Sequence, residues 1–230
     1  MEEIVNIVNA RVWLRRKIVE AGISIVGDRI AKIGKDSNLL KAERVFDAKG
    51  RLVLPGFIDV HTHLRDFELS YKEDFLSGTA AAVAGGFTLV LDMPNSKPPT
   101  TTPEVLKARI QKAEGRLYCD VGFYATPRSP DQVRDLANSG CVAIKIYMTR
   151  SLNGERYSME KEIYDLVKET SSLGIMLSVH AEDPRMIRKV SNSPSPNLHA
   201  KFHPIKAEEN AIDIVINAAR KSHGRIHICH

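Results

Sequence analysis

Residues 54–63 read LPGFIDVHTH and open the part of the chain that decides its fold. This apolar run ends in two histidines, and it is the first of several short segments rich in β-branched residues. Short apolar runs of this kind are typical of buried strands, and the stretches between them have the length and pattern of helices. We predict strands at 52–60, 87–91, 117–124, 142–147, 175–179 and 225–229, and helices at 72–84, 103–113, 130–137, 158–173 and 205–221.

The strict alternation of these elements predicts an α/β fold with a parallel sheet. Two architectures fit it: an open doubly wound sheet, or a (β/α)8 TIM-type barrel of which about six β/α units are present. No glycine-rich phosphate-binding pattern follows any of the strands, so the open sheet lacks the signature of its nucleotide-binding form. The position of the chemically active residues decides between the two.

Residues 1–50 have a different rhythm from the rest. Alternating runs at 22–26 and 29–33 flank Gly27-Asp28, which is a hairpin signal. We therefore predict a small β module over 1–50, incomplete without further strands, followed by a barrel domain over 51–230.

Composition and charge exclude several classes of function. The formal charge is +5, but lysine and arginine are scattered, so we expect no nucleic-acid partner. No run reaches the length of a membrane span, and the acidic N-terminus does not resemble a signal peptide. Three widely spaced cysteines suit a reducing compartment. We expect a cytoplasmic protein with no membrane partner.

Four histidines follow three of the predicted strands. His61 and His63 are two residues apart, a spacing that puts both imidazoles on one side of a strand, and His180 and His230 end two later strands. The carboxyl ends of barrel strands meet at one mouth, so these imidazoles can share metal ions, and imidazole suits zinc. Taken singly, each is more often a surface or structural histidine. We interpret the other histidines as structural or surface groups: His199, His203, His223 and His227.

Lys145 lies within the apolar strand predicted at 142–147. Burial disfavours the ammonium form, and a neutral amine can react with carbon dioxide to give a carbamate, an anionic group able to bridge two cations. The alternative is a lysine that extends to solvent at the end of its strand. The four histidines favour the carbamate.

At this point the sequence resembles a known family. Residues 54–65 (LPGFIDVHTHLR) resemble the entry motif of the amidohydrolase superfamily, and the final Leu-Arg is similar to dihydroorotases in particular. Other matching stretches are YKEDFLSGT at 71–79, AGGFT at 84–88, DMPN at 92–95 and FDAKG at 46–50. The resemblance covers nearly the whole chain.

This resemblance implies a (β/α)8 barrel with two Zn2+ ions per full-length subunit. His61 and His63 would hold one ion, His180 and His230 the other, and Lys145, as a carbamate, would bridge them. Such an enzyme hydrolyses the cyclic amide of dihydroorotate reversibly to N-carbamoyl aspartate in pyrimidine synthesis. Arg65 and Asn95 would bind the substrate carboxylate, although Arg65 could instead pair with Asp66 or Glu68, and Asn95 could shape a turn.

The sequence departs from the family pattern in two places. Phe67-Glu68 stands where dihydroorotases commonly have Pro-Gly, and no residue can be assigned as the general-base Asp, which we expect beyond residue 230. We therefore expect a longer enzyme, exposed edges on the first and sixth strands, and no turnover by the 230 residues alone. The alternatives are an allantoinase- or hydantoinase-type cyclic amidase, or a non-catalytic scaffold subunit. Homodimerisation and association with aspartate transcarbamoylase are left open as partners.

Overall fold

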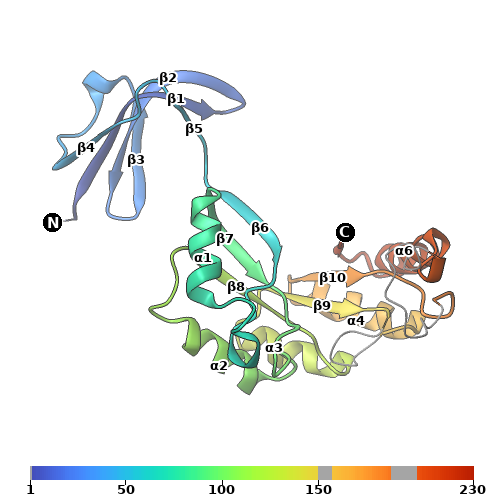
Figure 1. The fold of residues 1–230 in the computed structure, drawn as a ribbon. Coiled ribbons are helices and arrows are strands. Elements are labelled where there is room, and N and C mark those ends of the chain that lie inside the picture. The colour runs from blue at the N-terminus through green and yellow to red at the C-terminus, as the bar shows by residue number, and fades with distance from the viewer. Residues whose placement is uncertain (1, 150–156, 188–200) are drawn as a thin grey trace. The chain divides into compact units, whose positions relative to one another are not determined.

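The computed structural model describes residues 2–149, 157–187 and 201–230 and divides into two compact units, Met1–Gly56 and Phe57–His230 (Figure 1). Among the described residues, no helix has both the length and the apolar character needed to cross a bilayer.

The first unit is a small, mostly antiparallel sheet. β1 (Ile4–Leu14) pairs antiparallel with β2 (Lys17–Val26), which pairs with β3 (Arg29–Gly34) across the predicted Gly27-Asp28 turn. β4 (Arg44–Asp47) and the two-residue β5 (Leu52–Val53) run parallel to β1. The core consists of few residues, and Val45 and Phe46 of β4 are exposed.

The second unit is built on a six-stranded parallel sheet whose order follows the sequence, β6-β7-β8-β9-β10-β11. The strands are β6 (Phe57–Thr62), β7 (Phe87–Asp92), β8 (Asp120–Ala125), β9 (Ala143–Tyr147), β10 (Met176–His180) and β11 (Ile226–Ile228). This confirms the predicted α/β fold with six parallel strands.

Helices fill the connections between these strands. They are α1 (Phe75–Ala84), α2 (Pro103–Ala113), α3 (Val133–Asn138), α4 (Glu160–Ser172) and α6 (Ile205–Ser222), with 3-10 turns at Phe67–Leu69 and Pro130–Gln132. The largest apolar core lies between these helices and the sheet, and includes Phe75, Leu106, Leu136, Leu166 and Val215 from successive helices.

Several predicted boundaries were wrong, and two of these errors have a clear physical cause. The strand predicted at 52–60 is divided into β5 and β6, because Leu54-Pro55-Gly56 lies outside both strands, and Pro55 has no N–H for a ladder. α1 begins at Phe75 and not at Lys72, because Asp74 caps it: the Asp74 side chain accepts from the Ser77 N–H, and the Ser77 side chain reaches back to the Asp74 N–H.

The sheet curls strongly. Tyr124 on β8 donates its hydroxyl hydrogen to the Val60 carbonyl on β6 (3.1 Å) and accepts one from Ser178 on β10 (3.4 Å), although one strand lies between β8 and each of these two strands. The rings of His61 on β6 and His230 just after β11 have centroids 5.2 Å apart, although these strands are opposite edges of the sheet. A flat six-stranded sheet would separate its edges by about 24 Å. The second unit is therefore a half barrel.

Within the described residues β6 and β11 each pair with one neighbour, as predicted for the edges of the sheet. Phe57 and Ile58 of β6 are 51% and 58% exposed. Exposed apolar side chains on an edge strand mark a surface suited to further strand pairing.

A buried ion pair joins β7 to α2. Arg109 of α2 and Asp92 at the end of β7 are in direct contact, and both side chains are almost completely inaccessible to solvent. The guanidinium also lies over the rings of Phe67, Phe75 and Phe123 at 5.5–5.9 Å from their centroids. Removing one partner of such a pair leaves an uncompensated charge in the core.

We predict that Arg109→Met lowers the free energy of unfolding by about 3–5 kcal/mol, because Asp92 is left buried without its cation. Urea unfolding measures this change. Lys107→Met, at an exposed position of the same helix, is the matched control and is expected to change stability by about 0.5 kcal/mol or less. Equal stability of the two variants would contradict this account of the core.

The segment after β10 is anchored to α6 through Asp183. The Asp183 backbone N–H donates to the Ala207 carbonyl (2.9 Å), and its buried carboxylate accepts from the Arg185 guanidinium and the Asn210 amide. The hydrogen bonds from Arg185 lower the pKa of Asp183 from 3.8 to about 2, against the opposing effect of burial.

This pKa shift predicts a pH-dependent contribution to stability. The unfolded chain takes up the proton first as pH falls, so the contribution of Asp183 is complete above pH 3.8 and is lost as pH falls towards 2. Asp183→Asn should be less stable than the wild type by about 1.5–3 kcal/mol near neutral pH, and the gap should narrow in acid. Urea unfolding at a series of pH values tests this, with Asp213→Asn on the exposed face of α6 as the control. A gap that stays constant with pH would refute the assignment.

Candidate metal centre

The His61-Thr62-His63 segment is fixed to the neighbouring strand through Thr62. The Thr62 hydroxyl donates to the Leu91 carbonyl (3.0 Å), and the Thr62 carbonyl accepts from the Met93 N–H (2.9 Å). The His61 N–H donates to the Asp59 carboxylate (3.0 Å). These bonds fix the end of β6 against the end of β7.

The buried Asp92–Arg109 pair holds the next two residues. Asp92 accepts from the Leu64 N–H (2.8 Å), and Arg109 donates to the Arg65 carbonyl (3.4 Å). Leu64 is buried against Gly78 of α1, where an added Cβ would lie 2.6 Å from the leucine side chain. The loop that follows the two histidines is thus held by a charge pair and by close packing.

The four predicted histidines lie in one row. Ring centroids are 5.3 Å apart for His63 and His61, 5.2 Å for His61 and His230, and 4.8 Å for His230 and His180. His61 lies on β6 and His63 just after it, while His180 ends β10 and His230 follows β11. The curl of the sheet therefore assembles side chains that are up to 169 residues apart in sequence (230 − 61).

Lys145 lies on β9 beside this row and is 1% exposed. Its Nζ has no hydrogen-bond partner among the described residues and lies 5.2 Å from the centre of the Tyr147 ring. Burial lowers the pKa of the Lys145 amine, and the nearby Cys229 thiol offsets only part of that effect. The predicted alternative, an amine that extends to solvent, is wrong.

Burial and the charge of Lys145 also act on the histidines. Burial and then Lys145 lower the pKa of His61 to about 4, and burial is the main reason that the pKa values of His63 and His230 are lowered. These imidazoles are therefore neutral near pH 7 and keep a lone pair that can bind a cation.

Two of the ring nitrogens already have partners. His63 Nδ1 lies 2.9 Å from the Asn95 side-chain oxygen, and His180 Nε2 lies 2.8 Å from Glu182. The other Glu182 oxygen lies 2.8 Å from His203 Nδ1. Sequence reasoning missed Glu182 and treated His203 as a structural or surface residue. Glu182 could have been identified from the sequence as a candidate site residue, because it is a carboxylate two residues after a histidine that ends a strand.

Arg65 and Asn95 lie next to each other. The Arg65 guanidinium donates to the Asn95 backbone carbonyl (3.0 Å), and Asp66 accepts from Arg116 (2.9 Å). Among the described residues no ion pair joins Arg65 to Asp66 or Glu68. Arg65, Asp66 and Phe67 all have positive φ, at 56°, 56° and 51°. Three such residues in succession are strained, and the last of them, Phe67, is also the first residue at which the sequence departs from the expected Pro-Gly.

The histidines and Lys145 are of the types that can bind metal ions, but their arrangement in this structure is not that of a complete metal site. Within residues 2–149, 157–187 and 201–230, no three His, Cys, Asp or Glu side chains converge on one cation position. The orphaned Nζ of Lys145 is the observation that favours an additional group. Lys145 as a carbamate would add two anionic oxygens beside the imidazoles, a donor that the unmodified amine lacks.

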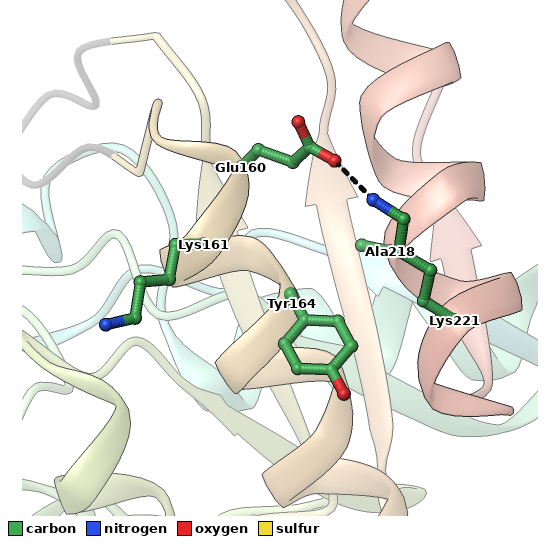
Figure 2. Close-up of a pocket in the computed structure, with 5 residues that line it drawn as sticks. All are labelled: Glu160, Lys161, Tyr164, Ala218 and Lys221. Carbon is green, nitrogen blue, oxygen red and sulfur yellow. Dashed lines mark hydrogen bonds and ion pairs between the residues drawn. The ribbon is translucent and has the colours of Figure 1, made fainter.

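Two hollows in the second unit differ in the residues that line them. A cavity of about 500 Å³ is lined by His180, Glu182, His203, Cys229 and His230, among others. A groove of about 520 Å³ between α4 and α6 is lined by Glu160, Lys161, Tyr164, Ala218 and Lys221, with an ion pair of 3.0 Å across it (Figure 2). That groove contains no histidine or cysteine. Of the residues predicted to bind metal, His180 and His230 line the cavity beside β10 and β11, and none lines the groove.

His199, predicted to be a structural or surface residue, lies outside the described residues. All residues predicted to bind metal or substrate lie within them: His61, His63, Lys145, His180, His230, Arg65 and Asn95.

Comparison with known proteins identifies close relatives over nearly the whole chain. Dihydroorotase from Pyrococcus furiosus is 36% identical over 97% of this chain and 49% of its own length. Dihydroorotase from Methanosarcina acetivorans is 31% identical over 98% of this chain and 50% of its own length. The chain thus spans about half the length of these relatives.

Solved structures agree on the fold. L-hydantoinase from Arthrobacter aurescens superimposes with a TM-score of 0.90 at 26% identity, covering 100% of this chain and 53% of that protein. Residues 52–216 match the model of the amidohydrolase family. The chain belongs to the amidohydrolase family.

Proposed function

We propose that the protein is a zinc-dependent dihydroorotase, which hydrolyses the cyclic amide of dihydroorotate reversibly to N-carbamoyl aspartate. The observation that carries the proposal is the buried Lys145 amine, which has no hydrogen-bond partner among the described residues, beside a row of four histidines. The similarity to dihydroorotases supports the choice of substrate.

In this proposal His61 and His63 hold one Zn2+, and His180 and His230 hold the second. The lowered pKa of Lys145 makes its amine available to attack carbon dioxide: a C–N bond forms, one proton leaves the nitrogen, and the product is a carbamate. That carbamate would bridge the two ions. When bound, the metal pair supplies a hydroxide nucleophile at neutral pH and polarises the amide carbonyl.

Arg65 is proposed to bind the substrate carboxylate. A guanidinium matches a carboxylate in a bidentate manner, and Arg65 is held beside Asn95 by its own hydrogen bond and by the Arg109 contact to its backbone. Asn95 would contribute from the same position. The proton-transferring residue is not assigned within the 230 residues.

Two other functions can be distinguished from dihydroorotase activity by experiment. A hydantoinase-type cyclic amidase, favoured by the structural similarity to L-hydantoinase, would act on rings without a carboxylate. A non-catalytic scaffold would bind no zinc. Cytoplasmic location is proposed from the three free cysteines, while homodimerisation and association with aspartate transcarbamoylase remain predictions.

The proposed function makes one prediction about Lys145. The full-length protein purified with bicarbonate should hold about two zinc ions per chain and show the added mass of one carbon dioxide on the peptide containing Lys145. Lys145→Ala should lose the modification, bind less than two zinc ions and be inactive, because the bridge is gone. Lys161→Ala, on exposed α4, is the control. A wild-type protein with no zinc would support the scaffold and contradict the enzyme.

The proposed function makes another prediction about the choice of substrate. Full-length protein should hydrolyse dihydroorotate in preference to dihydrouracil and allantoin. Arg65→Met should raise KM for dihydroorotate by about 10- to 100-fold, since a charged hydrogen bond to the carboxylate is lost, and should have a smaller effect on dihydrouracil. Arg220→Met in α6 is the control. Preference for dihydrouracil by the wild type would assign the protein to the hydantoinase type. The 230 residues assayed alone are expected to show no turnover.

A further inference from the structure

Glu182 has no part in the scheme above, yet its carboxylate lies between two histidines. One oxygen is 2.8 Å from His180 Nε2, and the other is 2.8 Å from His203 Nδ1. All three side chains are 21–27% exposed and line the cavity that also contains His230. The carboxylate therefore links His180, a predicted metal ligand, to a second histidine.

The backbone around Glu182 holds its carboxylate in place. The next residue, Asp183, is tied to α6 through Ala207 and Asn210 and is further held by Arg185. His203 comes just before α6 begins at Ile205. Glu182 is therefore held through its neighbour Asp183, which is bonded to α6, and through His203, which directly precedes α6. His180 is positioned instead by β10, which it ends.

The hydrogen bond to Glu182 limits what His180 can do. A neutral imidazole carries one N–H and one lone pair, and an ionised carboxylate can only accept. Nε2 must therefore carry the hydrogen, and Nδ1 is left as the nitrogen that can bind a cation. A carboxylate behind a histidine ligand also fixes the ring and strengthens it as a donor.

We propose that Glu182 is a positioning residue that holds His180 in one tautomer and one ring orientation, with Nδ1 available to a cation shared with His230. The use of this arrangement in zinc binding rests on the proposed function. The hydrogen bond itself does not, so the two can be tested separately.

The first experiment observes the hydrogen bond without metal. In metal-free protein labelled with 15N-histidine, nuclear magnetic resonance should show a slowly exchanging Nε2–H signal that is absent from His180→Asn. Glu182→Ala should lose the signal, whereas Glu182→Gln should keep it, because the amide oxygen still accepts. Glu208→Ala removes a different carboxylate from the same cavity and should leave the signal unchanged.

The second experiment titrates the same variants with Zn2+ alone. Glu182→Ala should weaken binding at one of the two sites by about 10- to 100-fold, and Glu182→Gln should weaken it less. Circular dichroism should show the same fold for Glu182→Ala and Glu208→Ala, which separates positioning from a general loss of structure.

The outcomes are distinct. A protected signal that disappears in Glu182→Ala and survives in Glu182→Gln supports the proposal. No protected Nε2–H signal in the wild type overturns it, and this result stands even if Glu182→Ala does not fold. If the wild type binds zinc, equal zinc affinity of the wild type and Glu182→Ala overturns the proposed effect of this hydrogen bond on metal binding. A wild type that shows the signal but binds no zinc supports the role of Glu182 and sinks the metal centre proposed above.

Discussion

The curl of the six-stranded sheet is the constraint on which the site depends. Tyr124 links β8 to the Val60 carbonyl on β6 and to Ser178 on β10, so one hydroxyl group joins three alternate strands. Side chains contributed by alternate strands form the layers of a barrel interior. Because the edges bend towards each other, His61 and His230 are neighbours. In a flat sheet the same residues would make two unrelated surface sites.

Electrostatics then determines the state of the side chains that the curl assembles. The Lys145 Nζ has no hydrogen-bond partner in the part of the chain that the structure describes, and its charge disfavours protonation of His61, His63 and His230. The absence of a partner would be a defect in an ordinary core, where buried charges are paired, as Arg109 is with Asp92. Because burial and mutual repulsion disfavour the charged forms of Lys145 and of these three imidazoles, the arrangement favours an anionic group on Lys145 and a cation bound to the imidazole lone pairs.

The sequence predicted the elements of this fold well where local signals were strong. The helix predicted at 103–113 matches α2, because Thr102 caps it and Pro103 occupies its first turn. It failed at Leu54–Gly56, where an apolar run is interrupted by a proline, and in the first unit, where β4 and β5 depend on pairing with β1. Strand pairing between distant segments is set by tertiary packing and cannot be read from local pattern.

The histidines and Lys145 could be predicted because they end or occupy strands, and the ends of parallel strands meet. Their partners could not. Asn95 was expected to face substrate, but its side-chain oxygen lies against His63, and Glu182 gains its position only through the anchoring of Asp183 to α6. Asn95 and Glu182 engage opposite nitrogens of the rings they contact, Nδ1 of His63 and Nε2 of His180. A neutral histidine has one lone pair, so these contacts leave Nε2 of His63 and Nδ1 of His180 for a cation. Positions of ligands can thus follow from topology, while the choice of nitrogen depends on side chains that only the folded structure brings together.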